Sequence, residues 1–139
     1  MIVADTSALF ALVDERQQDH ARVAAVVKRE RGPFLLSTFV LAELDYLLAT
    51  KVGIEAELAF LRSVADGDYP IEGFDESEVH RAAALIEQYQ DLDIGLADAS
   101  IVLLAARAQT SQILTLDERH FRALRPLRGG QFTLLPSDG

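Results

Sequence analysis

Two patterns of apolar residues alternate along this chain, and together they predict an α/β fold. Short, continuous apolar runs predict buried strands at residues 2–4, 34–36, 69–71, 112–115 and 132–135. Longer segments, in which apolar residues recur every three or four positions, predict helices at residues 7–13, 20–31, 38–48, 54–64, 76–89, 96–108 and 118–124. Strands that alternate with helices favour a parallel sheet covered on both faces. We therefore expect an α/β/α sandwich with a short central parallel sheet of about five strands.

The helical segments differ in how much of their surface is apolar. Segment 96–108 is the most apolar, because residues 101–104 place large aliphatic side chains nearly all around it, so we expect it at the centre of the fold. Segment 76–89 is amphipathic, and three of its residues are expected to face inward: Val79, Ala83 and Ile86.

Length and composition predict a single globular domain that spans residues 1–139. Half of the residues are hydrophobic and a quarter are charged, as in globular rather than disordered chains. The absence of cysteine excludes disulfides, zinc–thiolate sites and thiol catalysis. No apolar run approaches the roughly 18–20 residues that span a bilayer, so we expect a cytoplasmic protein without a membrane partner.

The overall charge argues against a nucleic-acid partner. The chain carries 22 acidic and 13 basic residues, for a net charge of −9, whereas nucleic-acid-binding proteins usually present a basic surface. The charges are unevenly distributed: residues 66–98 are strongly acidic, while residues 119–128 contain four arginines and no acid. Solvated helix faces explain such clusters equally well.

Four acidic residues share one setting, since each lies at the end of a strand or the start of a helix among apolar neighbours. They are Asp5, Glu43, Asp98 and Asp117. One such acid is commonly a helix cap or half of a salt bridge, but the chain has only two lysines, and its arginines lie mostly in polar segments. The carboxyl ends of parallel strands meet at one edge of a sheet, where ligands bind in open α/β folds. We therefore expect the four carboxylates to share one site.

Carboxylates gathered in apolar surroundings need a cationic partner, because an isolated buried charge is costly. Hard divalent cations such as Mg²⁺ and Mn²⁺ prefer oxygen ligands. They promote phosphodiester hydrolysis by activating water and by offsetting the charge that grows on the phosphate. The acids are thus predicted to be metal ligands first, with one of them orienting or deprotonating the water.

The residues around the four acids form short motifs: Asp-Thr-Ser-Ala at 5–8, Ala-Glu-Leu at 42–44, Leu-Ala-Asp-Ala-Ser at 96–100 and Thr-Leu-Asp-Glu-Arg-His-Phe at 115–121. In this order and spacing they resemble the acidic motifs of PIN-domain ribonucleases, and in particular those of the VapC toxins of bacterial toxin–antitoxin pairs. Each motif alone is weakly specific, but the ordered set covers essentially the whole chain.

This resemblance implies a PIN-like fold and a Mg²⁺- or Mn²⁺-dependent endoribonuclease, the toxin of a type II pair that inhibits translation. It also implies an RNA substrate, a cognate antitoxin protein and a homodimer. Asp5 and Asp98 would be the principal metal ligands, and Glu43 and Asp117 would complete the catalytic site. Three hydroxyl side chains would orient the carboxylates: Thr6, Ser7 and Thr115.

Further polar groups lie close to these acids in the sequence. Asp45 is two residues from Glu43, so on a helix it is expected to point elsewhere. Asp93 could reach the metal through water. His120 is interpreted as a surface residue of a short helix, with substrate contact as the alternative. The arginines at 119–128, together with Arg16, are hypothesised to guide the RNA backbone towards the acids.

Two other function classes are compatible with an acidic α/β site. The first is a Mg²⁺-binding phosphoryl-transfer or receiver-type domain. A haloacid-dehalogenase-type hydrolase would carry an acid where this chain has Ser7, and a receiver domain would carry paired acids and a late lysine that are absent here. The second is a non-catalytic PIN-like binding module, which would be expected to have lost one or more of the four acids.

Overall fold

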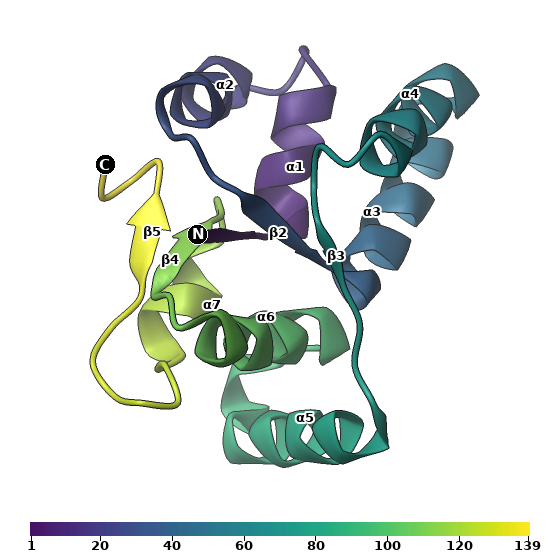
Figure 1. The fold of residues 1–139 in the computed structure, drawn as a ribbon. Coiled ribbons are helices and arrows are strands. Elements are labelled where there is room, and N and C mark those ends of the chain that lie inside the picture. Colours follow the sequence, from purple (N-terminus) through teal and green to yellow (C-terminus); the bar gives the residue numbers. More distant parts are fainter.

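The computed structural model describes residues 1–139 and contains a five-stranded sheet in which every strand pair is parallel (Figure 1). The strands are β1 (Ile2–Ala4), β2 (Phe34–Ser37), β3 (Ile71–Glu72), β4 (Gln112–Leu114) and β5 (Thr133–Leu135). Their order across the sheet is β3-β2-β1-β4-β5, which makes the N-terminal strand central. In the register of the sheet, Ile2 pairs with Phe34 and Val3 with Ile113.

Seven α-helices flank this sheet: α1 (Thr6–Val13), α2 (His20–Arg29), α3 (Thr38–Lys51), α4 (Ile54–Ala65), α5 (Glu76–Gln88), α6 (Leu96–Ala108) and α7 (Glu118–Ala123). A short 3₁₀ helix, η1 (Gln90–Leu92), precedes α6. In Figure 1, α1 and α2 lie above the sheet and α5, α6 and α7 lie below it. Helix α3 packs beside α1, and α4 packs against α3. The expected α/β sandwich is confirmed.

One cluster of 32 buried hydrophobic residues fills the space between the sheet and the helices. Strand β1 is buried along its whole length, which explains why its sequence is continuously apolar rather than alternating. Helix α6 is central, as expected, with every residue from Ala99 to Ala105 buried. No helix combines the length and the apolar character that crossing a membrane requires.

A pair of buried serines ties α6 to the sheet. The Ser37 hydroxyl, at the end of β2, accepts a hydrogen bond from the Phe39 backbone N–H and so caps α3. The same hydroxyl lies 2.7 Å from the Ser100 hydroxyl of α6, which also donates to the Ala97 carbonyl. The starts of α3 and α6 are thereby held at the same edge of the sheet.

The sequence patterns located the elements but placed one helix face wrongly. Val79 and Ala83 of α5, both expected to face inward, are exposed, whereas Ile86 is half-buried and packs against the core as expected. The fully buried residues of α5 are Ala82 and Leu85, and this helix packs against α6. Three successive alanines at 82–84 leave the apolar period ambiguous, so packing decides how the helix is rotated about its axis.

The strand order creates a crevice at the carboxyl ends of β1 and β4. Strand β1 pairs with β2 on one side and with β4 on the other, so the order of the chain across the sheet reverses next to β1. Ligands bind at such a switch point in open α/β sheets, beyond the carboxyl ends of the strands. Asp5 follows β1 directly, and Asp117 follows β4 after a short turn.

Candidate metal-dependent active site

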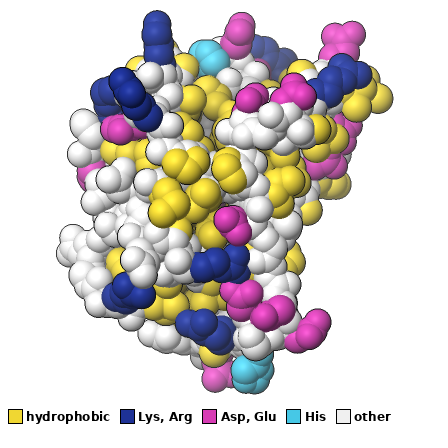
Figure 2. All heavy atoms as spheres, viewed as in Figure 1, with side chains coloured by type: hydrophobic (Ala, Val, Ile, Leu, Met, Phe, Trp, Pro, Cys, Tyr) yellow, Lys and Arg dark blue, Asp and Glu magenta, His cyan; other side chains and the backbone are white.

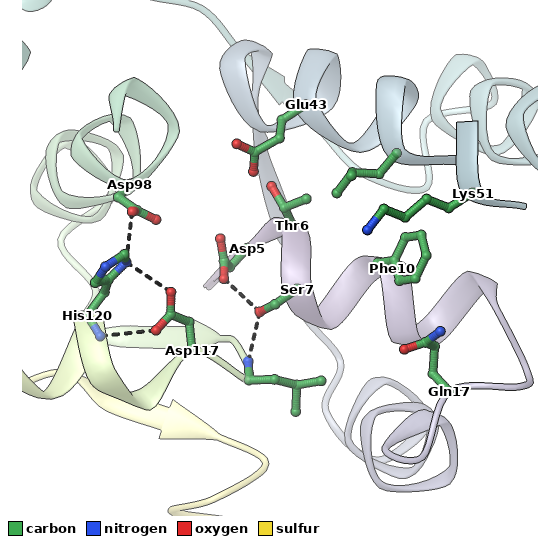
Figure 3. Close-up of a pocket in the computed structure, with 12 residues that line it drawn as sticks. Asp5, Thr6, Ser7, Phe10, Gln17, Glu43, Lys51, Asp98, Asp117 and His120 are labelled. Atoms are coloured by element: carbon green, nitrogen blue, oxygen red, sulfur yellow. Dashed lines mark hydrogen bonds and ion pairs between the residues drawn. The ribbon is translucent and has the colours of Figure 1, made fainter. Parts of the chain in front are cut away.

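A pocket of about 470 Å³ opens at this switch point and is lined by all four acids predicted from the sequence. Asp5 comes from the end of β1, Glu43 from α3, Asp98 from the first turn of α6, and Asp117 from the start of α7. Figure 3 shows Asp5 between Glu43 on one wall and the pair Asp98 and Asp117 on the other. Segments that are far apart in the sequence thus bring four carboxylates to one place.

Asp5 is the most buried of the four acids, with 4% of its surface exposed. It occupies the cap position of α1, yet its side chain makes no capping hydrogen bond. Its Oδ2 atom instead accepts hydrogen bonds from Ser7 Oγ at 2.8 Å and from Thr115 Oγ1 at 2.7 Å. Burial raises the pKa of Asp5, and these two hydroxyls lower it in part. These two hydroxyls therefore fix the orientation of the Asp5 carboxylate. The alternative interpretation of Asp5 as a side-chain cap of a helix is wrong.

Ser7 and Thr115 also join the ends of the two central strands. Thr115 is fully buried, and its hydroxyl accepts a hydrogen bond from the Asp117 backbone N–H at 2.9 Å while it donates to Asp5. The Ser7 hydroxyl accepts from the Leu116 backbone N–H at 3.0 Å. The turn after β4 is thus coupled to the Asp5 carboxylate through Ser7 and Thr115. The resemblance implied an orienting role for Thr6 as well, but its hydroxyl makes no hydrogen bond.

Asp98 faces Asp117 across the imidazole of His120. His120 Nδ1 lies 3.1 Å from Asp98 Oδ2 and 2.9 Å from Asp117 Oδ2. Asp117 also accepts a hydrogen bond from the His120 backbone N–H at 3.0 Å, and so caps α7. Burial, together with the charge of Asp5, raises the pKa of Asp98 to about 6. One carboxyl group of this cluster therefore titrates close to neutral pH.

The position of His120 corrects the sequence reading of an exposed surface histidine. Its side chain is only 16% exposed and lines the pocket between two acids. Its ring nitrogen and one carboxylate oxygen each from Asp98 and Asp117 all lie within 4.8 Å of one another, close enough to hold one metal ion. The three-residue spacing from Asp117 within a short helix is the signal that could have found it, since residues three apart share a helix face.

Thr6 and Glu43 form the remaining wall of the acidic part of the pocket. The Thr6 hydroxyl oxygen is buried and has no hydrogen-bond partner, although the side chain lines the pocket. Glu43 is exposed and has no ion-pair partner. A buried hydroxyl without a hydrogen-bond partner is costly, so the Thr6 hydroxyl is available to a ligand that enters the pocket. The exposed Glu43 carboxylate is available to the same ligand.

Other charged residues considered from the sequence lie outside this pocket. Asp45 turns away from the pocket as expected and lies near Glu57 of α4, whose pKa it raises. Asp93 is exposed and does not line the pocket. Arg122 is held by Asp138 and Glu118, and Arg16 by Asp14. Neither arginine contacts the four acids.

Residues 2–125 match the PIN domain family. The chain belongs to the PIN-domain family. Over 135 residues it is 47% identical to ribonuclease VapC26 of Mycobacterium tuberculosis, an alignment that covers 97% of this chain and the whole of the relative. This PIN domain is therefore a ribonuclease of the VapC type, a class of hydrolase.

Solved structures of low sequence identity share the fold of this PIN domain. Mycobacterium tuberculosis VapC20, described as a sarcin–ricin loop cleaving toxin, superimposes with a TM-score of 0.79 at 18% identity over 84% of this chain and 90% of that one. A toxin–antitoxin complex from Klebsiella pneumoniae superimposes with a TM-score of 0.68 at 15% identity, over 89% of this chain and 92% of that one. FitAcB from Neisseria gonorrhoeae superimposes with a TM-score of 0.62 at 23% identity, over 87% of this chain and 91% of that one.

PIN-domain ribonucleases depend on a metal, and the pocket of this PIN domain fits a divalent cation. Its acids supply oxygen donors, the ligand type preferred by hard cations. Burial, with the nearby charges of Asp5 and Asp117, raises the pKa of Asp98, so a bound cation would stabilise its ionised form. The partnerless Thr6 hydroxyl provides a further oxygen that can bind the ion or one of its waters.

Proposed function

We propose that this PIN domain, acting as a single nuclease domain over residues 1–139, is a Mg²⁺- or Mn²⁺-dependent endoribonuclease of the cytoplasm. In this proposal it is the toxin of a type II toxin–antitoxin pair and inhibits translation by cutting RNA. The observation that carries the proposal is the single pocket lined by Asp5, Glu43, Asp98 and Asp117. No lysine or arginine lies within 4.0 Å of any of these carboxylates.

Asp5 and Asp98 would hold the cation, and Asp117 and Glu43 would complete its surroundings directly or through water. A bound divalent cation supplies activation of water and stabilisation of charge on the phosphate. Ser7 and Thr115 hold the Asp5 carboxylate in one orientation, which limits the reorganisation needed during the reaction. His120, between Asp98 and Asp117, is placed to meet the cation or the substrate.

The metal requirement can be tested with the purified protein and total RNA. Cleavage should occur with Mg²⁺ or Mn²⁺, stop when a chelator is added, and resume when either ion is supplied in excess. The cleaved ends should be mapped by sequencing, which also identifies the RNA. Cleavage that persists in chelator would contradict the proposed chemistry, in which a divalent cation activates the water and stabilises charge on the phosphate.

The proposed protein partners are a cognate antitoxin and a second copy of the chain. The fold similarity to the Klebsiella pneumoniae toxin–antitoxin complex supports the first. Large apolar side chains exposed on α3 and α4, among them Tyr46, Ile54 and Leu58, are available for protein contacts and support the second. Size-exclusion chromatography with light scattering should give twice the mass of the chain, and a mass of one chain at micromolar concentration would rule out the homodimer.

A further inference from the structure

The pocket has a second part that extends away from the acids, between α1 and α3. This part is lined by Phe10 of α1 and by Leu47 and Lys51 of α3. Glu43, Leu47 and Lys51 are spaced four residues apart, so they share one face of α3. Lys51 lies eight residues beyond Glu43, about 12 Å along the helix axis. Figure 3 shows the Lys51 ammonium at the opposite end of the pocket from Asp98 and Asp117, beside the Phe10 ring.

Lys51 is the only lysine or arginine that lines this pocket. Its ammonium is exposed and has no carboxylate within 4.0 Å. On the face drawn in Figure 2, lysine and arginine side chains are scattered among acidic ones and form no continuous basic surface. In a chain with a net charge of −9, attraction of a phosphate to the pocket therefore depends on local positive charge, and Lys51 supplies it.

Phe10 supplies an apolar surface next to this charge. Its ring packs partly against the core and remains partly exposed where it lines the pocket. Leu47 lines the pocket from the facing helix α3. An aromatic ring beside a cation is the combination that binds single-stranded nucleic acid, because the ring stacks on a base while the cation contacts the backbone.

We propose that Phe10 and Lys51 form a nucleotide subsite for the RNA substrate. The Phe10 ring stacks on a base, and the Lys51 ammonium binds a phosphate that neighbours the one being cut. This inference rests on the proposed function and deepens it. The sequence placed the guiding charge on Arg16 and the arginines at 119–128, but no arginine lines the pocket. The guanidinium groups of Arg16 and Arg122 are already paired with Asp14 and Asp138.

The chain offers a matched control, since Lys28 of α2 is its only other lysine and is also exposed. In an Asp98→Asn background that prevents cleavage, binding of single-stranded polyuridylate should be measured over a range of salt concentrations. Lys51→Gln should weaken binding by roughly tenfold or more, as for a lost hydrogen bond to a charged group. It should also reduce the salt slope by about 0.7, the value for one contact with a single-stranded phosphate. Lys28→Gln should change neither the affinity for polyuridylate nor the salt slope.

A second variant tests the stacking half of the proposal. Phe10→Leu keeps an apolar side chain against the core but removes the aromatic face, and should weaken polyuridylate binding about fivefold or more without changing the salt slope. Because binding is measured without cleavage, this test can succeed or fail independently of the nuclease activity. Equal RNA binding by Lys51→Gln and Lys28→Gln overturns the subsite. Weaker binding of only the antitoxin by Lys51→Gln would assign this part of the pocket to the protein partner instead.

Discussion

Replacing Asp98 with Asn should reduce RNA cleavage by on the order of a thousandfold or more while the fold stays intact. The amide has nearly the shape of the carboxyl group but carries no negative charge, so it binds a divalent cation poorly. Asp5→Asn should act similarly, because its carboxylate is held towards the same pocket by Ser7 and Thr115. The measurement is kcat/KM for a mapped RNA site, with circular dichroism to verify folding.

Asp45→Asn provides the control for these two variants. Asp45 lies on the same helix as Glu43 and carries the same charge, but it lies near Glu57 and does not line the pocket. Its replacement should leave kcat/KM within a few-fold of wild type. If Asp98→Asn and Asp45→Asn lose activity to the same extent, the assignment of the pocket is wrong.

The Asp98→Asn variant should also be more stable than wild type when both are free of metal at pH 7, by on the order of 1–3 kcal/mol. Burial and neighbouring negative charge raise the pKa of Asp98 from 3.8 to about 6 in the folded protein. Its ionised form is therefore disfavoured by folding. This penalty is fully present above about pH 6 and disappears as the pH falls towards 3.8. Removing the charge removes the penalty.

Urea denaturation in the presence of chelator, at pH 7 and at pH 5, measures this effect. The stability advantage of Asp98→Asn should shrink at pH 5, where wild-type Asp98 is mostly protonated. In excess Mg²⁺ or Mn²⁺ the wild type should become more stable than Asp98→Asn, since a ligand that binds only the folded state stabilises it. A variant that is less stable than metal-free wild type at pH 7 would show that Asp98 is a structural residue rather than a metal ligand.

Much of the fold could be predicted from local sequence patterns. Strand β1 reads as a continuous apolar run because both of its faces are buried, and α6 reads as apolar all around because it is central. The predicted order of strands and helices along the chain was confirmed, because burial leaves such a pattern in each element. The inner face of α5 could not be predicted, because its alanines offer no strong preference and contact with α6 decides its rotation.

Some residues of the site could likewise be predicted from the sequence, and others could not. The four acids stood out because each is a charged residue at an element end among apolar neighbours, and the structure places them in one pocket. Their individual catalytic roles stay predictions. His120 was interpreted from the sequence as a surface residue, and Lys51 was not considered for the site, since a histidine or a lysine on a helix is ordinary in sequence. Whether such a side chain enters a pocket depends on residues far away in the chain.

By itself, then, the sequence determined the α/β class, the position of each acid at an element end, and the family to which the chain belongs. These properties are local, because burial on both faces and helix starts leave their signature within a few residues. Only the tertiary structure decided that His120 lies between Asp98 and Asp117, and that Lys51 and Phe10 extend the pocket beyond the acids. The physical reason is that the rotation of each helix about its axis is set by packing against elements distant in the sequence.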